Sequence, residues 1–468
     1  MSTDPSATPE TGAGHPGDPG TPDWSGFTRF AGIAAIAGFI LFAAAGFLNI
    51  SAAGDEHTTA AKARFASGFL TGYTFWLSLP VGAMALLLIA HLVKSSWGLL
   101  LRRPFEAASR TLPLLFGLWV VLIVVASQTS LYWWTHPEEI HISKASESAL
   151  TDGTSDKREQ AIRVSEVMVR NAVTYERNAR ASGNYGFLSL PAFIGVGVVL
   201  FLIWGTMTYF LNKWGQEAAN ATTREGVEAA LTKANKLGGP GLIIYAITIT
   251  AGATQWVMSV EPSWSSTMFP VIFAVNQLLT AFAFCLALFL LIVGRPPFKD
   301  VMRPKFQLDM GTLLLAFTMF WSYTSFSQFM LVWIGNLPEE IPFFLRRSTG
   351  GWWWVSAALC VFHFAVPFLL LLFRDIKLHP VRLRAVAVYL LFICALDVMW
   401  WIAPTFNAGT SLFPDWHSSF PAWLIDVGAV AGIGGLWGLY FIRELKSRPL
   451  MPVSEVYRLP EGHHHEQH

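Results

Sequence analysis

Long apolar runs alternate with polar segments along most of the chain. Each run holds roughly 20 or more residues with few charges, which is the length that a helix needs to cross the hydrocarbon core of a bilayer. The pattern predicts ten transmembrane helices, at 28–49, 70–93, 111–134, 186–211, 239–260, 267–294, 308–335, 352–373, 381–404 and 421–442. We therefore expect an all-α membrane protein.

The composition supports this class and limits the partners. The 468 residues are 53% hydrophobic and 13% charged, whereas soluble proteins carry about 25% charged residues. The net charge of +1 provides no concentrated basic field, which argues against nucleic acid as a partner.

The two ends of the chain differ from its middle. Residues 1–27 are rich in Pro, Gly and Thr, and we expect a disordered tail there because such a segment buries little apolar surface. Residues 28–442 form the predicted ten-helix transmembrane domain, and residues 443–468 form a second polar tail.

The distribution of Lys and Arg predicts the orientation. These residues concentrate in the even-numbered connections between the spans and in the C-terminal tail, so the positive-inside rule predicts that both termini are cytoplasmic. The third connection, 135–185, is assigned to the outside although it contains seven Lys or Arg. Within it, 157–182 has an apolar side and is expected to form a surface helix, either at the membrane interface or against an extracytoplasmic partner.

Two pairs of short segments repeat at a distance of four spans. "LYWWTHPEEI" (Leu131–Ile140) resembles "LVWIGNLPEEI" (Leu331–Ile341), and "QWVMSVEP" (Gln255–Pro262) resembles "DVMWWIAP" (Asp397–Pro404). Parallel repeats are a known membrane architecture. The repeats predict two parallel four-helix bundles, about 70–260 and about 267–404, with the first and last spans outside them.

The repeated corners place two pairs of glutamates at the outer mouths of these bundles. They are Glu138 and Glu139 in the first corner and Glu339 and Glu340 in the second. Carboxylates at this depth can simply face water. Alternatively, they guard a polar path into the bundle, since repulsion raises the pKa of one member of an adjacent pair and suits it to proton exchange.

A few polar residues lie within or at the ends of the spans, where ionisable groups are costly. His363 and Asp397 are the deepest, and Glu261 closes the fifth span. A lone His is more often a hydrogen-bonded core residue, but an Asp in hydrocarbon requires a proton or a partner. The hydrogen-bonding candidates are Gln128, Tyr323, Ser327 and Gln328. Tyr323 and Ser327 share a helical stripe that serves either a proton path or contacts between helices.

The sequence contains no motif of a soluble catalytic or metal site. It lacks a P-loop, GxSxG, HExxH and a dinucleotide-binding fingerprint. Cys285, Cys360 and Cys394 lie in apolar runs without CxxC spacing, so we expect buried side chains rather than ligands of zinc, iron–sulfur clusters or covalent haem. The chain alone is not expected to be a catalyst.

Four segments resemble a known family. They are "ITAGATQWVMSVEPSWSSTMFPV", "FWSYTSFSQFMLVWIGNLPEEIPFFLRR", "GWWWVSAALCVFHFAVPFLLLLFRDIK" and "LDVMWWIAPTF". Together they resemble one of the two large membrane components of bacterial alternative complex III, which belong to the polysulfide-reductase membrane-subunit (NrfD-like) family. The resemblance covers roughly residues 245–405, and the number of spans agrees with it.

The resemblance implies a subunit of a quinol:cytochrome c or quinol:oxidase oxidoreductase in the bacterial inner (plasma) membrane. The implied partners are a second NrfD-like subunit, an iron–sulfur subunit, c-type haem subunits, small membrane subunits, lipids and, in some assemblies, a terminal oxidase. The haem c and iron–sulfur clusters belong to these partners, and a quinone or quinol is the ligand implied for this chain. The polar residues named above are then candidates for a proton path or a quinone pocket.

Two other functions fit the same sequence. A secondary transporter also combines repeats with buried carboxylates, and Pro80, Pro191 and Pro367 would break its helices near a midplane site. A purely structural anchor would hold the redox subunits at the membrane without using its polar residues. Solute uptake distinguishes the transporter, and substitutions of the polar residues distinguish the anchor.

Overall fold

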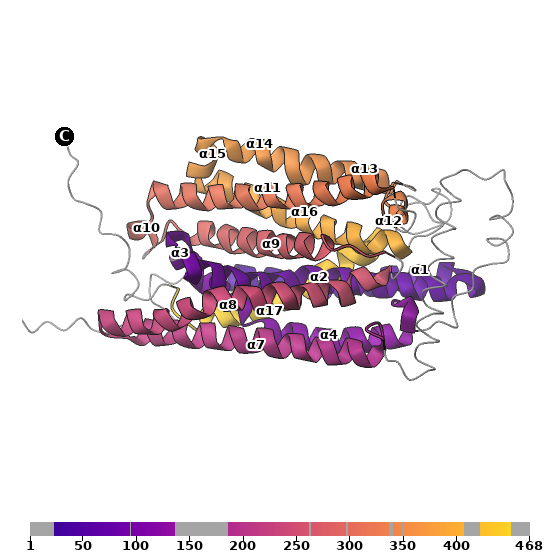
Figure 1. Cartoon of the computed structure of the whole chain (residues 1–468), viewed down its shortest axis with the longest axis horizontal. Helices are drawn as coiled ribbons and strands as arrows, with labels where there is room; N and C mark the ends of the chain where they lie inside the picture. Colours follow the sequence, from indigo (N-terminus) through magenta and orange to yellow (C-terminus); the bar gives the residue numbers. More distant parts are fainter. Residues whose placement is uncertain are drawn as a thin grey trace, which may run out of the picture.

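The chain folds into helices, with no strand in the part described here. The computed structural model describes residues 23–93, 95–135, 186–261, 264–295, 298–336, 340–348, 351–406 and 422–450. Within these ranges, nine helices are long and apolar enough to cross a membrane. They lie roughly side by side along the long axis (Figure 1). The architecture is that of an all-α, multi-pass membrane protein.

The bounds of the helices follow the apolar runs. The long helices and the segments that form spans are α1 (Ser25–Ala52), α2 (Gly54–Val93), α3 (Ser96–Ser109), α4 (Leu112–Gln128), α7 (Leu190–Asn220), α8 (Arg224–Trp256), α9 (Phe269–Ile292), α11 (Pro304–Gly335), α13 (Trp352–Ala358), η4 (Leu359–Ala365), α14 (Val366–Leu372), α16 (Pro380–Phe406) and α17 (Trp423–Lys446). The short elements are η1 (Trp133–Thr135), η3 (Met258–Val260), α10 (Phe298–Val301), α12 (Ile341–Arg346) and α15 (Arg374–Leu378).

Nine of the ten predicted spans coincide with these nine apolar helices, α3 and α4 counting together. The predicted span 308–335 lies on α11, a helix of 32 residues that is not among the nine. Its middle carries the polar run from Ser322 to Gln328, which lowers its hydropathy. The predicted span 111–134 also ends early, at Gln128. Polar side chains compete for the backbone there, since Thr129 donates to the carbonyl of Val125 at 2.8 Å.

The expected tails are shorter than predicted. Helix α1 begins at Ser25, whose N–H donates to the Asp23 carboxylate at 2.9 Å, and helix α17 continues to Lys446 with Leu445 buried against its neighbours. Residues 1–22 and 451–468 lie outside the described ranges. So does the expected surface helix at 157–182.

Two central helices hold the structure together. In α2 and α9, 78% and 83% of the most apolar stretch is buried, against 22% in the segment from α13 to α14. Helix α2 packs on α4, α7 and α8, which we call the first helix group. Helix α9 packs on α11 and α16, which in turn contact η4 and α14, and these form the second helix group. The two groups meet where α2 contacts α9 and α16.

Helices α1 and α17 pack against each other and against α2. Small residues bring α1 and α17 close together, as is common in membranes. A Cβ atom at Gly435 would lie only 2.1 Å from the backbone nitrogen of Ala35. A buried ion pair between Arg64 on α2 and Asp426 fixes α17 further, and Arg64 also donates to the carbonyl of Ala422 at 2.9 Å.

Candidate functional site

Helices of the second group converge on the carboxylate of Asp397 in α16. Its Oδ2 atom accepts hydrogen bonds from the Asn276 side-chain amide of α9 at 2.9 Å and from the Trp321 indole of α11 at 2.8 Å. The Thr280 hydroxyl donates to Asn276 Oδ1 at 3.2 Å, which holds the amide nitrogen toward the carboxylate. Asp397 is only 2% exposed. The sequence identified Asp397, but it gave no sign of these partners.

His363 is the second member of this site, and it is completely buried. Its ring stacks on the Trp321 indole, with centroids 3.6 Å apart and an interplanar angle of 25°. Its Nδ1 atom has no hydrogen-bond partner among the described residues and lies 3.9 Å from Asp397 Oδ2. Its Nε2 atom lies 3.7 Å from Cys394 Sγ. The structure thus brings together the two deepest candidates that the sequence identified.

A local break in the helix places His363. Pro367 has no N–H group to donate to the carbonyl of His363, four residues earlier, so the regular α-helical pattern cannot continue through it. The segment Leu359–Ala365 is a π-helix instead, in which the N–H of Val366 donates to the carbonyl of Val361, five residues earlier. Such π turns are frequent at functional sites.

The geometry suits proton transfer better than metal binding. A carboxylate and an imidazole both accept and release protons, and their 3.9 Å separation is about 1 Å beyond a hydrogen bond. A shift of about 1 Å between the two side chains would join them by a hydrogen bond. No group of three His, Cys, Asp or Glu side chains among the described residues could hold a metal ion.

A second buried cluster lies where α8, α12 and α16 end. Glu261 Oε1 lies 3.0 Å from Arg346 Nη1, and its Oε2 lies 3.7 Å from Arg347 Nη1. The Thr405 hydroxyl donates to Oε2 at 3.3 Å. Glu261 is only 3% exposed, so the predicted candidate is an ion-paired buried carboxylate.

Arg347 links this cluster to α16 by hydrogen bonds. It donates to the carbonyls of Trp400 at 3.0 Å, Trp401 at 2.6 Å and Phe343 at 2.7 Å, and its guanidinium lies 3.3 Å from the centroid of the Phe343 ring. Burial lowers the pKa of Arg347 to about 9 against the opposing effect of Glu261, which leaves it charged at neutral pH. Sequence reasoning did not select Arg346 or Arg347. The adjacent pair of arginines could have indicated a buried partner, because basic residues are few at this end of the spans.

An aromatic layer separates the two clusters. Asp397 and Thr405 are eight residues apart on α16, or about 12 Å at the rise of an α-helix. Trp401 lies between them and packs against Phe269 and Phe273 of α9, with centroids 5.4 and 5.8 Å away. Transfer of a proton between the clusters therefore requires water or a change of side-chain positions in this layer.

The other candidates lie apart from Asp397. Gln328 is buried and accepts from the Ser266 hydroxyl at 2.7 Å, and Glu340 is half-buried at the start of α12. The Tyr323 stripe, however, faces outward: Tyr323 is 67% exposed and Ser327 is half-buried.

Three further predictions from the sequence have different outcomes. Gln128 is exposed at the end of α4. Glu138, Glu139 and Glu339 lie outside the described residues. The expectation of buried cysteines holds for Cys285 and Cys394 but is wrong for Cys360, which is exposed because its side of the helix faces away from the core.

The first helix group has a different interior. Trp119, Trp204 and Trp256 pack there with Phe201 and Phe193, mostly at centroid distances near 6 Å. In the sequence repeat, Gln255 stands where the second group has Asp397, and it donates to the carbonyl of Phe187 at 3.2 Å. At corresponding positions of the sequence repeat, the first helix group therefore has an aromatic interior and the second a polar one.

No family model matches the sequence, and no curated protein matches it. The interpretation of the site therefore depends on its own geometry and on the resemblance of the segments that carry it.

Proposed function

We propose that the chain is a membrane subunit of a respiratory quinol-oxidising complex and that His363 and Asp397 carry protons within it. The observation that carries the proposal is the convergence of α9, α11, η4 and α16 on these two groups. Trp321, His363 and Asp397 all belong to the segments that resemble the NrfD-like component of alternative complex III. The proposed location is the bacterial inner membrane, with both termini cytoplasmic.

The two helix groups are interpreted as the two parallel four-helix bundles of the repeat, with α11 as the seventh of ten spans and α1 and α17 outside the bundles. The packing of each group around α2 or α9 supports this arrangement. The proposed partners are a second NrfD-like subunit, an iron–sulfur subunit and c-type haem subunits, which hold the redox groups.

A proton path fits the site better than a quinone pocket. Oxidation of a quinol releases protons as well as electrons, and the electrons go to redox groups in the partners. Side chains from several helices surround His363 and Asp397, which are 0% and 2% exposed. A quinone ring requires a cavity next to its hydrogen-bonding groups, whereas a proton requires only a chain of such groups. The Glu261 cluster is the proposed outer end of the path.

Purification of the chain from its native membrane in a gentle detergent tests its membership of the complex. We expect c-type haem absorption in the visible spectrum and an iron–sulfur protein among the copurifying chains. A colourless, monodisperse chain that takes up solute when reconstituted alone would contradict the proposal and favour a secondary transporter.

A further inference from the structure

A cavity of about 460 Å³ lies on the side of α7 that faces the ends of α3 and α17. It is remote from Asp397, since α7 belongs to the first helix group. The lining residues are Arg110, Thr208, Tyr209, Asn212, Lys213, Gln216, Glu217, Asn220 and Arg448. This is the end of the spans that the sequence predicts to be cytoplasmic.

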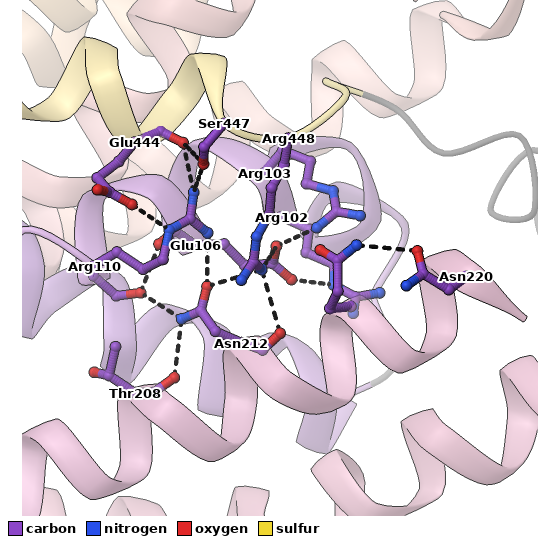
Figure 2. Close-up of polar contacts among 12 residues, drawn as sticks. Arg102, Arg103, Glu106, Arg110, Thr208, Asn212, Asn220, Glu444, Ser447 and Arg448 are labelled. Carbon is purple, nitrogen blue, oxygen red and sulfur yellow. Dashed lines mark hydrogen bonds and ion pairs between the residues drawn. The ribbon is translucent and has the colours of Figure 1, made fainter. Parts of the chain in front are cut away.

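Guanidinium groups outnumber carboxylates beside this cavity (Figure 2). Glu106 forms buried ion pairs with Arg102, at 2.8 Å, and with Arg103, and lies 3.7 Å from Arg448. Arg110 pairs with Glu444 at 2.8 Å. With Lys213 and Glu217, which also line the cavity, five basic side chains face three carboxylates, so an excess of positive charge remains next to it.

Several donors in this region remain available to an anion. Arg103 is buried and does not line the cavity, so it adds positive charge nearby but no donor within the cavity. Lys213 lines the cavity with its side chain exposed. Burial, followed by repulsion from Arg110, lowers the pKa of Arg448. A bound anion would relieve that repulsion and accept hydrogen bonds from Lys213 and Arg448.

The surface of α7 beyond the cavity suits an acyl chain. Val198, Leu202, Gly205 and Tyr209 lie on the same face of the helix as Lys213, because they are three, four or seven residues apart. Leu202 is 64% exposed and Tyr209 61% exposed, and a Cβ atom at Gly205 would meet nothing within 4 Å. An open apolar strip therefore leads from the cavity along the membrane-spanning part of α7.

We propose that this cavity binds the phosphate of an anionic phospholipid, with Lys213 and Arg448 as its main ligands and an acyl chain along the α7 strip. Basic pockets between helices on the cytoplasmic side are suited to such headgroups. A free phosphate shares the headgroup chemistry but makes no use of the strip.

Thermal unfolding in nanodiscs tests the site, with phosphatidylglycerol and phosphatidylcholine as the two lipids. We expect phosphatidylglycerol to raise the unfolding midpoint of the wild-type chain. We expect Lys213→Gln/Arg448→Gln to lose that gain and to retain phosphatidylglycerol about tenfold less well in native mass spectrometry. The matched control, Arg224→Gln/Lys236→Gln, removes two exposed charges of α8 that do not line the cavity and should keep the gain.

Lys213→Gln alone separates loss of lipid binding from a folding defect of the double variant. The exposed lysine makes none of the contacts that hold Arg448 to Asn212. This variant should fold normally and lose part of the phosphatidylglycerol gain. An equal gain from inorganic phosphate in phosphatidylcholine discs would identify free phosphate as the ligand and overturn the lipid assignment. A gain from phosphatidylglycerol that is the same in the wild type, Lys213→Gln and both double variants would overturn the site.

Discussion

Two of the buried ion-paired clusters in this protein lie at junctions between helices. Arg64 and Asp426 join α2 to α17, and Glu261 joins the end of α8 to Arg346 and Arg347. A buried charge that loses its partner keeps its desolvation cost, so removing one member costs more than the pair contributes. These pairs fix which helices meet without adding much net stability.

The Arg64–Asp426 pair provides a test of this view. Arg64→Met should destabilise the chain by about 3–5 kcal/mol because it leaves a buried carboxylate uncompensated. Arg64→Met/Asp426→Leu should recover most of that loss, since both charges are then gone. Tryptophan-fluorescence unfolding of the purified chain in detergent measures both variants. Additive losses in the double variant would show that the pair is not coupled.

At the scale of the element, the π segment of the eighth span determines where His363 lies. The ring faces Trp321 and Asp397 because five-residue hydrogen bonding replaces the regular pattern just before Pro367. An unbroken α-helix would rotate the residues on one side of the break relative to those on the other. The position of the His363 ring therefore depends on the conformation of the helix as well as on the residue itself.

Pro367→Ala tests the contribution of this break. It restores the N–H group that a regular helix needs, so we expect part of the π segment to convert and His363 to move away from Asp397. Quinol oxidation by the assembled complex should fall several-fold, while the haem content of the complex stays unchanged. Pro80→Ala, which changes a proline inside α2, is the control. Equal activities in the two variants would remove the π segment from the mechanism.

At the scale of the whole molecule, the two ends and the two halves differ. Helix α3, next to the basic cavity, and helix α12, which carries Arg346 of the Glu261 cluster, lie at opposite ends of the long helices (Figure 1). The second helix group contains the polar pair, and the first has an aromatic interior at the same level of the repeat. One half thus serves proton transfer in our proposal, while the other provides packing and a lipid contact.

The sequence was sufficient for some of these features and not for others. Apolar runs predict spans because a bilayer sets their length, and Asp397 and His363 stand out because hydrocarbon penalises them. The outward direction of Tyr323 could not be predicted, since polar and apolar residues are spread around all sides of α11 and its pattern does not show which face meets the core. Asn276 and Trp321 reach Asp397 only through tertiary packing, which no local pattern encodes.

Proton release during quinol oxidation tests the central proposal most directly. It should be measured on the assembled complex in sealed vesicles with Asp397→Asn, and Asp309→Asn should serve as control because Asp309 is exposed on α11. Quinol oxidation releases protons with its electrons in every variant, so we expect Asp397→Asn to change the side of release: protons released per electron on the outer side, where the proposed path ends at Glu261, should fall by about half or more at unchanged haem content. Asp309→Asn should match the wild type. Wild-type proton release and turnover in Asp397→Asn would contradict the role proposed for the pair and leave the chain as an anchor for its partners.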